Sequence, residues 1–286
     1  MTHPTLTNPT EQLAADPSHP VDSWWFTARL RTHQTVFWAK IHAMVIQDTC
    51  HSTVSLLQEP HGHTSHQHAA ESTDTITRST TALDLDTTIL TLRGNLDDLE
   101  ITGTTGQASI QLALHREEPV LHTGGSGIFP FLGATSGQYA LPGLTTTGTI
   151  TTAHTTHQVN GRTWLDRQWK LEGPHTPQNT KPPRFTWLGL DLGAGRYLSV
   201  WDTDGDGTSW LTALHADGTH TITHAQRTDH PDGGWKLTVP ALHATLRITH
   251  QPLPDSHPGL YAAVCRVTGT LADENINAHG YADILG

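Results

Sequence analysis

Short stretches in which apolar and polar residues alternate recur along most of the chain, and they predict β-strands rather than helices. The first stretch opens at residues 24–26 and continues through residues 37–41. From Ala82 to Leu114 the alternation is broken by turn residues such as Gly94-Asn95, which is typical of an antiparallel meander. The first half of the chain is therefore predicted to form a sheet.

The second half repeats this pattern with a hairpin and a series of short strands. Asn160-Gly161 is a strong hairpin signal, and it predicts a turn between strands at 144–152 and 162–171 that open a second sheet. Short strands at a regular spacing, separated by Gly, Asp or Pro turns, indicate a β-sandwich or barrel. The further predicted strands are Phe185–Leu192, Tyr197–Trp201, Ser209–Leu214, Thr219–Ala225, Trp235–Val239, Leu242–Thr249 and Tyr261–Leu271.

Three segments lack the alternation and divide the chain. Residues 1–20 are predicted to form a flexible arm, residues 58–77 hold a histidine-rich polar run that predicts a long loop, and residues 115–142 are rich in glycine turns. The crossing between two domains is expected in or just after the last of these segments. The expected organisation is an arm at 1–20, an N-terminal β-domain at 21–142 and a C-terminal β-domain at 143–286.

Composition and charge agree with an all-β protein and exclude some partners. Thr, Val, Ile, Leu and Trp recur between many of the 25 Gly and 17 Pro of the 286 residues, while helix formers are scarce. The formal net charge of -11, without a basic run, would repel the phosphates of nucleic acids. The prolines of the first twenty residues fit neither a secretory signal nor a membrane span, so a cytoplasmic location is expected. Cys50 and Cys265 are then expected to be buried free thiols.

The segment from Gly161 to Trp169 carries the most informative chemistry. Alternate side chains of a strand point to opposite faces, so one face holds Trp164, Asp166 and Gln168, and the other holds Leu165, Arg167 and Trp169. If the first face lines an apolar cavity, desolvation would raise the pKa of Asp166 and make it a proton donor to a carbonyl or alkene. The alternative is that Asp166 and Arg167 form part of a buried ion pair that ties the two halves together.

Nine tryptophans are unusual in a chain that is only 6% aromatic. Each indole offers a large flat face and one N–H group, which suits binding an extended polyene by shape. Ordinary core packing is the competing interpretation, and we expect it for about half of them. The candidates for substrate binding are Trp24, Trp25, Trp164, Trp169 and Trp187, together with Phe129, Phe131 and Gln168.

Two polar segments have residue types found in metal sites, but neither predicts one. His61, His63, His66 and His68 lie in the expected loop, which would not hold the preorganised geometry that zinc requires. Residues 202–207 imitate the start of an EF-hand loop, yet its twelfth position is Ala213 rather than glutamate, so a tight hairpin turn is expected. Glycine-rich phosphate motifs, zinc-enzyme signatures and a nucleophile elbow are missing from the sequence, and we expect neither cofactor nor metal.

Four segments in a fixed order resemble one known family. They are Asp22–Phe26, Gly137–Pro142, Gly161–Trp169 and His279–Asp283. They are similar to the family that joins carotenoid 1,2-hydratases (hydroxyneurosporene synthases) with AttH-type lipocalin-like proteins, and the similarity spans nearly the whole chain. The resemblance implies two lipocalin-like antiparallel β-barrels or sandwiches around a central pocket. Its members include hydratases of isoprenoid double bonds and cyclases that form decalins by Diels–Alder chemistry.

The resemblance also implies which residues of this sequence correspond to the family's motif residues. The family's tandem aromatic signature falls on Trp24 and Trp25, its mid-chain tyrosine on Tyr139, and the tryptophan and aspartate of the later strand on Trp164 and Asp166. Where the hydratases and cyclases carry Asp-His-Asn-Trp, residues 166–169 read Asp-Arg-Gln-Trp, which is nearer the Asp-Arg-Glu-Trp of AttH-like members. Ser23 stands where many relatives have Glu, and Tyr139 is single where many have a pair.

Three functions follow as hypotheses. The first is a cofactor-independent cyclase that folds an apolar polyene or polyketide for an intramolecular Diels–Alder-like reaction, with Asp166 or Tyr139 as the polarising donor. The second is a hydratase that adds water to an isoprenoid or carotenoid double bond, with Asp22 or His122 as the second group. The third is a lipocalin-like carrier of a hydrophobic ligand that performs no reaction.

Overall fold

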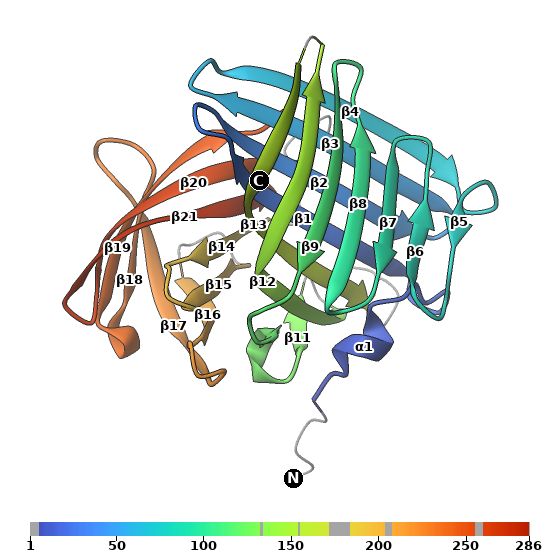
Figure 1. The fold of residues 1–286 in the computed structure, drawn as a ribbon. Coiled ribbons are helices and arrows are strands. Elements are labelled where there is room, and N and C mark those ends of the chain that lie inside the picture. The colour runs from blue at the N-terminus through green and yellow to red at the C-terminus, as the bar shows by residue number, and fades with distance from the viewer. Residues whose placement is uncertain are drawn as a thin grey trace.

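A computed structural model describes residues 6–131, 134–153, 155–171, 184–203, 208–254 and 260–285. Residues 21–170 form one antiparallel sheet that curls into a half-barrel, in the strand order β4-β3-β2-β1-β13-β12-β9-β8-β7-β6-β5, with β10 and β11 also paired to β12 (Figure 1). The strands are β1 (Val21–Arg31), β2 (Val36–Ile46), β3 (Thr49–Glu59), β4 (His63–Ser72), β5 (Thr77–Arg78), β6 (Leu83–Asp86), β7 (Leu90–Gly94), β8 (Asp98–Thr104), β9 (Ala108–His115), β10 (Leu121–His122), β11 (Ile128–Phe131), β12 (Ala134–Thr152) and β13 (Thr155–Lys170).

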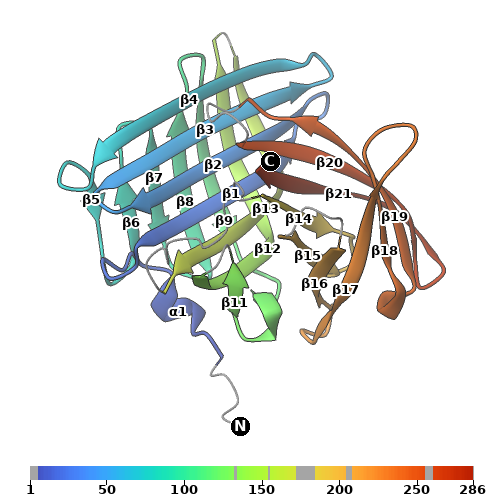
Figure 2. The ribbon, with the colours of Figure 1, turned by 180° about the vertical axis from the view of Figure 1, so that it is seen from behind.

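Residues 185–285 close into a separate eight-stranded antiparallel barrel that lies beside the half-barrel (Figure 2). Its strands are β14 (Phe185–Asp191), β15 (Tyr197–Asp202), β16 (Thr208–Leu214), β17 (His220–Asp229), β18 (Trp235–Val239), β19 (Ala244–Pro252), β20 (Leu260–Leu271) and β21 (Glu274–Leu285). The described helices are the short α1 (Pro9–Gln12) and the 3₁₀ turns η1 (Thr123–Gly125) and η2 (Pro240–Leu242). The predicted all-β class with two antiparallel units is confirmed.

Strand alternation divides the buried side chains among three cores. On β1, Trp24 and Phe26 point into the half-barrel, whereas Trp25 points to the opposite face. An aliphatic cluster that includes Leu188 and Leu237 fills the interior of the closed barrel. The third core lies between the two units and is rich in aromatic residues, so part of the outer face of the barrel is buried and apolar.

The predicted hairpin at Asn160-Gly161 is wrong. Both residues lie inside β13, and the turn that joins β12 to β13 falls between Thr152 and Thr155. Gly161 allows β13 and β1 to approach closely, because a Cβ at this position would lie only 2.0 Å from the carbonyl oxygen of Arg29. The long hairpin of β12 and β13 belongs to the first sheet. The chain passes to the barrel only after Lys170, so the expected boundary at 142/143 lies inside β12.

Two segments predicted to be irregular, residues 58–77 and 115–142, contain β-strands. Residues 63–72 of the histidine-rich run at 58–77 form the edge strand β4, paired along its length to β3, rather than part of a long loop. Its polar residues suit an edge strand because much of β4 is accessible to solvent. Within 115–142, β12 already begins at Ala134. The meander at 82–114 and the seven predicted strands of the second half are present, and the final strand β21 was not predicted.

The N-terminal residues that the structure describes are docked rather than free. The Tyr139 hydroxyl donates to the carbonyl oxygen of Pro9 at 3.1 Å, and the Trp24 indole donates to that of Leu13 at 2.8 Å. Arg167 donates to the carbonyls of Gln12 and Ala14 at 2.6 and 3.0 Å. The prediction of a flexible arm is therefore wrong for residues 6–20. Buried side chains of the half-barrel satisfy the backbone carbonyls of this segment, which ties it down.

Candidate functional site

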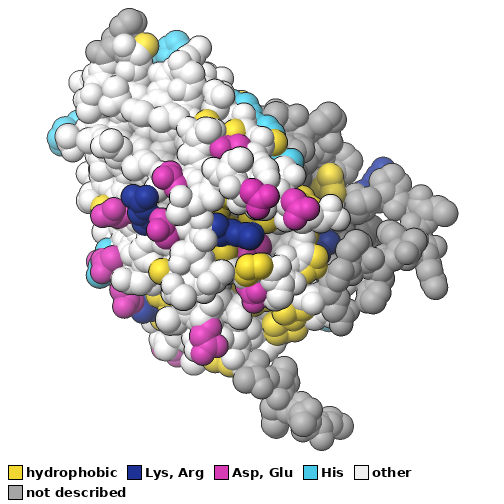
Figure 3. Space-filling view, turned by 90° about the vertical axis from the view of Figure 1, so that its right-hand side faces the viewer, with side chains coloured by type: hydrophobic (Ala, Val, Ile, Leu, Met, Phe, Trp, Pro, Cys, Tyr) yellow, Lys and Arg dark blue, Asp and Glu magenta, His cyan; other side chains and the backbone are white. Residues whose placement is uncertain are grey.

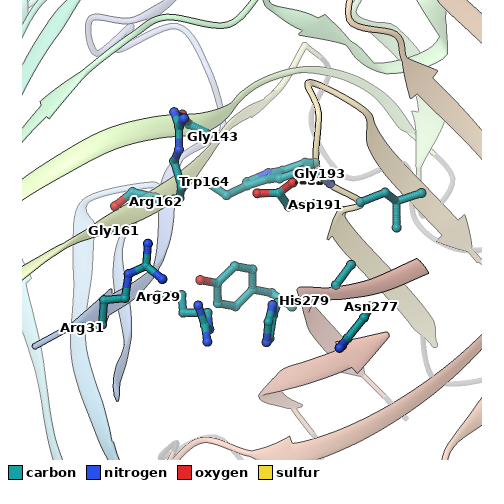
Figure 4. Close-up of a pocket in the computed structure, with 14 residues that line it drawn as sticks. Arg29, Arg31, Gly143, Gly161, Arg162, Trp164, Asp191, Gly193, Asn277 and His279 are labelled. Atoms are coloured by element: carbon teal, nitrogen blue, oxygen red, sulfur yellow. Dashed lines mark hydrogen bonds between the residues drawn. The ribbon is translucent and has the colours of Figure 1, made fainter. Parts of the chain in front are cut away.

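A cavity of about 230 Å³ lies where the half-barrel sheet meets the closed barrel. Its walls come from β1, β12 and β13 on one side, and from β14, β21 and the turn after β14 on the other. Figure 4 shows arginine side chains on the side of the sheet, and Asp191, Asn277 and His279 on the side of the barrel. Both units contribute walls, so the cavity depends on how they pack together.

Aromatic side chains hold the two units together around the cavity. Trp187 of β14 meets Trp25 of β1 edge to face with ring centroids 4.8 Å apart, and it meets Trp164 of β13 at 5.9 Å. Such edge-to-face pairs stabilise beyond the area they bury. Of these residues, Trp164 lines the cavity. The predicted substrate-binding residues that share this interface are Trp25, Phe129, Phe131, Trp164 and Trp187.

Asp166 lies behind Trp164 rather than in the cavity wall. The Trp164 indole N–H donates a hydrogen bond to Oδ1 of Asp166 at 2.9 Å, and both side chains are buried. Burial raises the pKa of Asp166 to about 8; the Trp164 hydrogen bond opposes this rise, and the charge of Asp283 adds to it. The expected desolvated acid is therefore present, but the cavity lining includes Trp164 and not Asp166.

Three other predicted site residues lie on the opposite face of the sheet. Trp24, Tyr139 and Trp169 belong to the half-barrel core, with Tyr139 and Trp169 packed at 6.2 Å. Gln168 is half-buried and shares the face of Trp164 and Asp166, paired in register with Ser23 and Gln138. The expected meeting of Trp24, Tyr139 and Asp166 in one pocket is wrong, because alternation along the strands sends their side chains to two sides of the sheet.

Arg167 forms the predicted buried ion pair, but its partner is Asp22 rather than Asp166. The two side chains are almost fully buried, and Nη2 lies 2.5 Å from Oδ1 of Asp22. The guanidinium also stacks over the Trp24 ring, with Cζ 4.3 Å from its centroid. Asp22 and Arg167 stand on neighbouring strands of one sheet, so the pair organises the half-barrel interior and does not join the two units.

Three titratable residues of the barrel line the cavity. Asp191 and His279 are paired in register on β14 and β21, and Tyr281 follows two residues along β21. Burial raises the pKa of Asp191, and it lowers that of His279 to about 4, with Arg29 and Arg266 adding to the effect. Burial also raises the pKa of Tyr281. At neutral pH His279 is thus an uncharged acceptor, and Asp191 holds its proton to higher pH than an exposed aspartate.

A bulge in β12 shapes the sheet side of the cavity. The register of β12 against β13 shifts between Leu141 and Leu144, where Gly143 has a φ of 68°. A Cβ at this position would lie 2.1 Å from the Tyr197 hydroxyl, so the contact requires glycine. The Gly143 carbonyl accepts a hydrogen bond from Arg162 at 2.6 Å, which fixes that guanidinium at the cavity rim.

Among the residues that the structure describes, no group of three or more His, Cys, Asp or Glu side chains is placed to hold a metal ion. His66 shares a hydrogen bond with Ser55 at 2.9 Å. The turn expected at 202–207 falls largely on residues outside those described, and Asp202 itself pairs with Arg227 at 2.6 Å. His122, whose pKa is lowered by burial to about 4, lies outside the cavity lining.

The model of the AttH-like family matches residues 4–282. The chain belongs to the AttH-like family. Two solved structures share the fold of this AttH-like chain. An AttH protein from Nitrosomonas europaea has a TM-score of 0.76 and 15% identity, covering 100% of this chain and 98% of its own. Kievitone hydratase from Nectria haematococca has a TM-score of 0.77 and 16% identity, covering 98% of this chain and 95% of its own.

No curated protein sequence matches the AttH-like chain. No helix of the described residues has the length and apolar character needed to cross a membrane. The family predicted from the four motif segments is confirmed by the match of the family model over residues 4–282.

The sequence analysis missed most polar residues of the cavity in this AttH-like chain. His279 and Tyr281 lie in the last family-like segment, and their alternation on a strand would have placed them on one face. Arg29 and Arg31 share a face of β1 with Trp25 for the same reason. Asp191 carries no such signal, because only the pairing of β14 with β21 brings it beside His279.

Proposed function

We propose that this AttH-like chain is a hydratase that adds water to a carbon–carbon double bond of a small unsaturated molecule bound between the two β-units. The observation that carries the proposal is the pairing of Asp191 and His279 in the wall of one cavity, with opposite pKa shifts. A hydratase needs one group that gives a proton and one that takes a proton from water. The shared fold of kievitone hydratase supports this chemistry.

The proposed reaction balances with these two side chains. Neutral His279 takes a proton from water as the water oxygen bonds to one alkene carbon. The other alkene carbon takes the proton of Asp191, so a C–H bond forms as the acid O–H bond breaks. The histidine then returns its proton to the aspartate through solvent, which restores both groups. Trp164 and Tyr281 provide aromatic surface for the unsaturated substrate.

Product mass tests the proposal directly. Kievitone, prenylated phenols and conjugated carboxylates serve as probes in water labelled with oxygen-18, and the expected product has gained one labelled water. Asp191→Asn and His279→Gln should each lower the rate by roughly 100-fold or more. Asp217→Asn, in an exposed turn of the same barrel, is the matched control.

The two competing functions give different outcomes in the same experiment. An isomeric product of unchanged mass would overturn the hydratase and support the intramolecular cyclase. Tight binding with no product from any probe would support the carrier. The cyclase hypothesis itself stays a prediction, with its polarising donor Asp166 placed one side chain behind the cavity wall.

A further inference from the structure

The cavity concentrates positive charge in a chain of net charge -11. Arg29 and Arg31 of β1 and Arg162 of β13 all line it. Arg29 and Arg162 face each other directly, because they are paired in register on neighbouring strands. Like charges in that relationship destabilise a sheet. The arrangement therefore needs a compensating partner.

Arg162 already has its partners. Its Nη1 donates to the Gly143 carbonyl at 2.6 Å and to the Thr145 hydroxyl at 2.9 Å, and it lies 3.3 Å from Glu117. The Arg162 guanidinium is therefore already engaged in hydrogen bonds to β12 and in an ion pair with Glu117. The unmatched charge in the cavity is that of Arg29 and Arg31.

Arg29 is held in place without being neutralised. Its guanidinium carbon lies 5.4 Å from the centroid of the Trp38 ring, and its Nε is buried without a hydrogen-bond partner. Within the described residues, no carboxylate comes within ion-pair distance of Arg29 or Arg31. The cavity's own acid, Asp191, is not within ion-pair distance of either arginine, and burial raises its pKa.

Most other arginines among the described residues lie within ion-pair distance of a carboxylate. On the face in Figure 3, dark blue basic side chains lie beside magenta acidic ones. Arg93 lies 3.0 Å from Asp84, and Arg266 lies 2.8 Å from Glu59. Arg29 and Arg31 therefore differ from most other arginines of the described residues in having no carboxylate partner.

We propose that Arg29 and Arg31 form an oxyanion subsite that anchors a carboxylate, or an ionised phenol or enol, at one end of an unsaturated substrate. The proposal rests on the proposed function only in placing that substrate in this cavity. Guanidinium groups present planar, paired donors that match such anions. The cavity of about 230 Å³ suits a compact ligand, with Trp164 and Tyr281 against its conjugated part.

Binding of a matched pair of probes tests the subsite without any turnover. trans-Cinnamate carries the anion and trans-cinnamamide is its neutral counterpart, and calorimetry measures both affinities. The wild type should bind cinnamate at least about tenfold more tightly than the amide, which is about 1.4 kcal/mol. Arg29→Gln and Arg31→Gln should each remove most of this preference while amide binding is kept. Arg93→Gln changes the net charge equally outside the cavity and should retain it.

Three outcomes of the binding experiment would overturn the subsite. Equal binding of acid and amide by the wild type, or no cinnamate binding, contradicts it, and so does a preference that survives in both cavity variants. Arg31 is exposed, so its variant reports on the subsite even if Arg29→Gln lowers stability. Cinnamate binding that depends on these arginines, without hydration of any probe, would contradict the hydratase and leave the subsite standing.

Discussion

The Trp164 indole donates its hydrogen bond to the Asp166 carboxyl two residues along the same strand, at 2.9 Å. This bond places the ring of Trp164 in the cavity wall and the acid behind it. Asp166 therefore orients an aromatic wall of the site, and its own ionisation is governed by burial.

Replacing Asp166 with Asn should change how stability depends on pH. The pKa of Asp166 is about 8 in the folded protein, whereas in the unfolded chain it is near 3.8, the ordinary value of an aspartate. Raising the pH through this window therefore favours the unfolded state of the wild type, by up to about 1.4 kcal/mol per pH unit. Asp166→Asn lacks this slope, and its Oδ1 can still accept from Trp164. Urea unfolding across the window measures the difference, with exposed Asp74→Asn as the control. Parallel pH curves for wild type and Asp166→Asn would contradict the burial argument.

Replacing Arg167 with Met should destabilise the half-barrel strongly. The substitution leaves the Asp22 carboxylate buried without its ion-pair partner, which costs about 3–5 kcal/mol. The double variant Asp22→Asn, Arg167→Met should recover part of the loss, because no buried charge remains. Urea unfolding of the three proteins checks this, and a loss below about 1 kcal/mol in the single variant would show that the pair is not important for stability.

Replacing Tyr139 with Phe should affect the N-terminal segment and not the cavity. The change removes the hydrogen bond to Pro9 and should lower the free energy of unfolding by about 1 kcal/mol. Cinnamate affinity should stay within about twofold, since Tyr139 lies on the other face of the sheet. Unfolding and calorimetry measure the two effects. Lost turnover with unchanged stability would instead support the family-based role of Tyr139 as a polarising donor.

Replacing Gly189 with Ala should strain the contact between the two units. A Cβ at Gly189 would lie 2.5 Å from the Trp187 ring and 3.2 Å from that of Trp164. Overpacking of this kind costs typically about 1–3 kcal/mol. Gly106→Ala is the control, because nothing lies within 4 Å of a Cβ there. Equal thermal unfolding midpoints for the two variants would contradict tight packing at the interface.

The rate of hydration should fall on the acid side only near pH 4. His279 must be neutral to accept a proton, and burial holds its pKa at about 4, below the ordinary 6.5. On the alkaline side the rate should fall as Asp191 loses its proton, at a pKa that burial raises above the ordinary aspartate value. Arg29→Gln removes a positive neighbour of His279, so the acid limb should move to higher pH. Profiles of kcat/KM against pH check both limbs, and an acid limb near the ordinary histidine value would contradict the assignment.

Much of the fold is predictable from local pattern. Alternation identified the meander of the first half and seven strands of the barrel, because each strand has one buried face. Asn160-Gly161 has the sequence of a turn but lies inside a strand, because Gly161 is needed for the close contact with the Arg29 backbone. The histidines of β4 resemble a loop because an edge strand needs little apolar surface.

The candidate site was predictable only in part. Alternation on β13 correctly separated Trp164 and Asp166 from Arg167 and Trp169. It does not say which face meets a second domain, so Tyr139 and Trp24 were grouped with Asp166. The pairing of Asp191 with His279 depends on how β14 and β21 close the barrel, which is a long-range contact that no local pattern encodes.

The cavity is built mainly from outward-facing residues of two units whose interiors are separately filled. Substitutions at its wall can therefore alter ligand preference without repacking either interior. Selection for a new substrate and selection for folding act on largely different side chains. Residues of the cavity wall can therefore change while the strands and their registers stay the same.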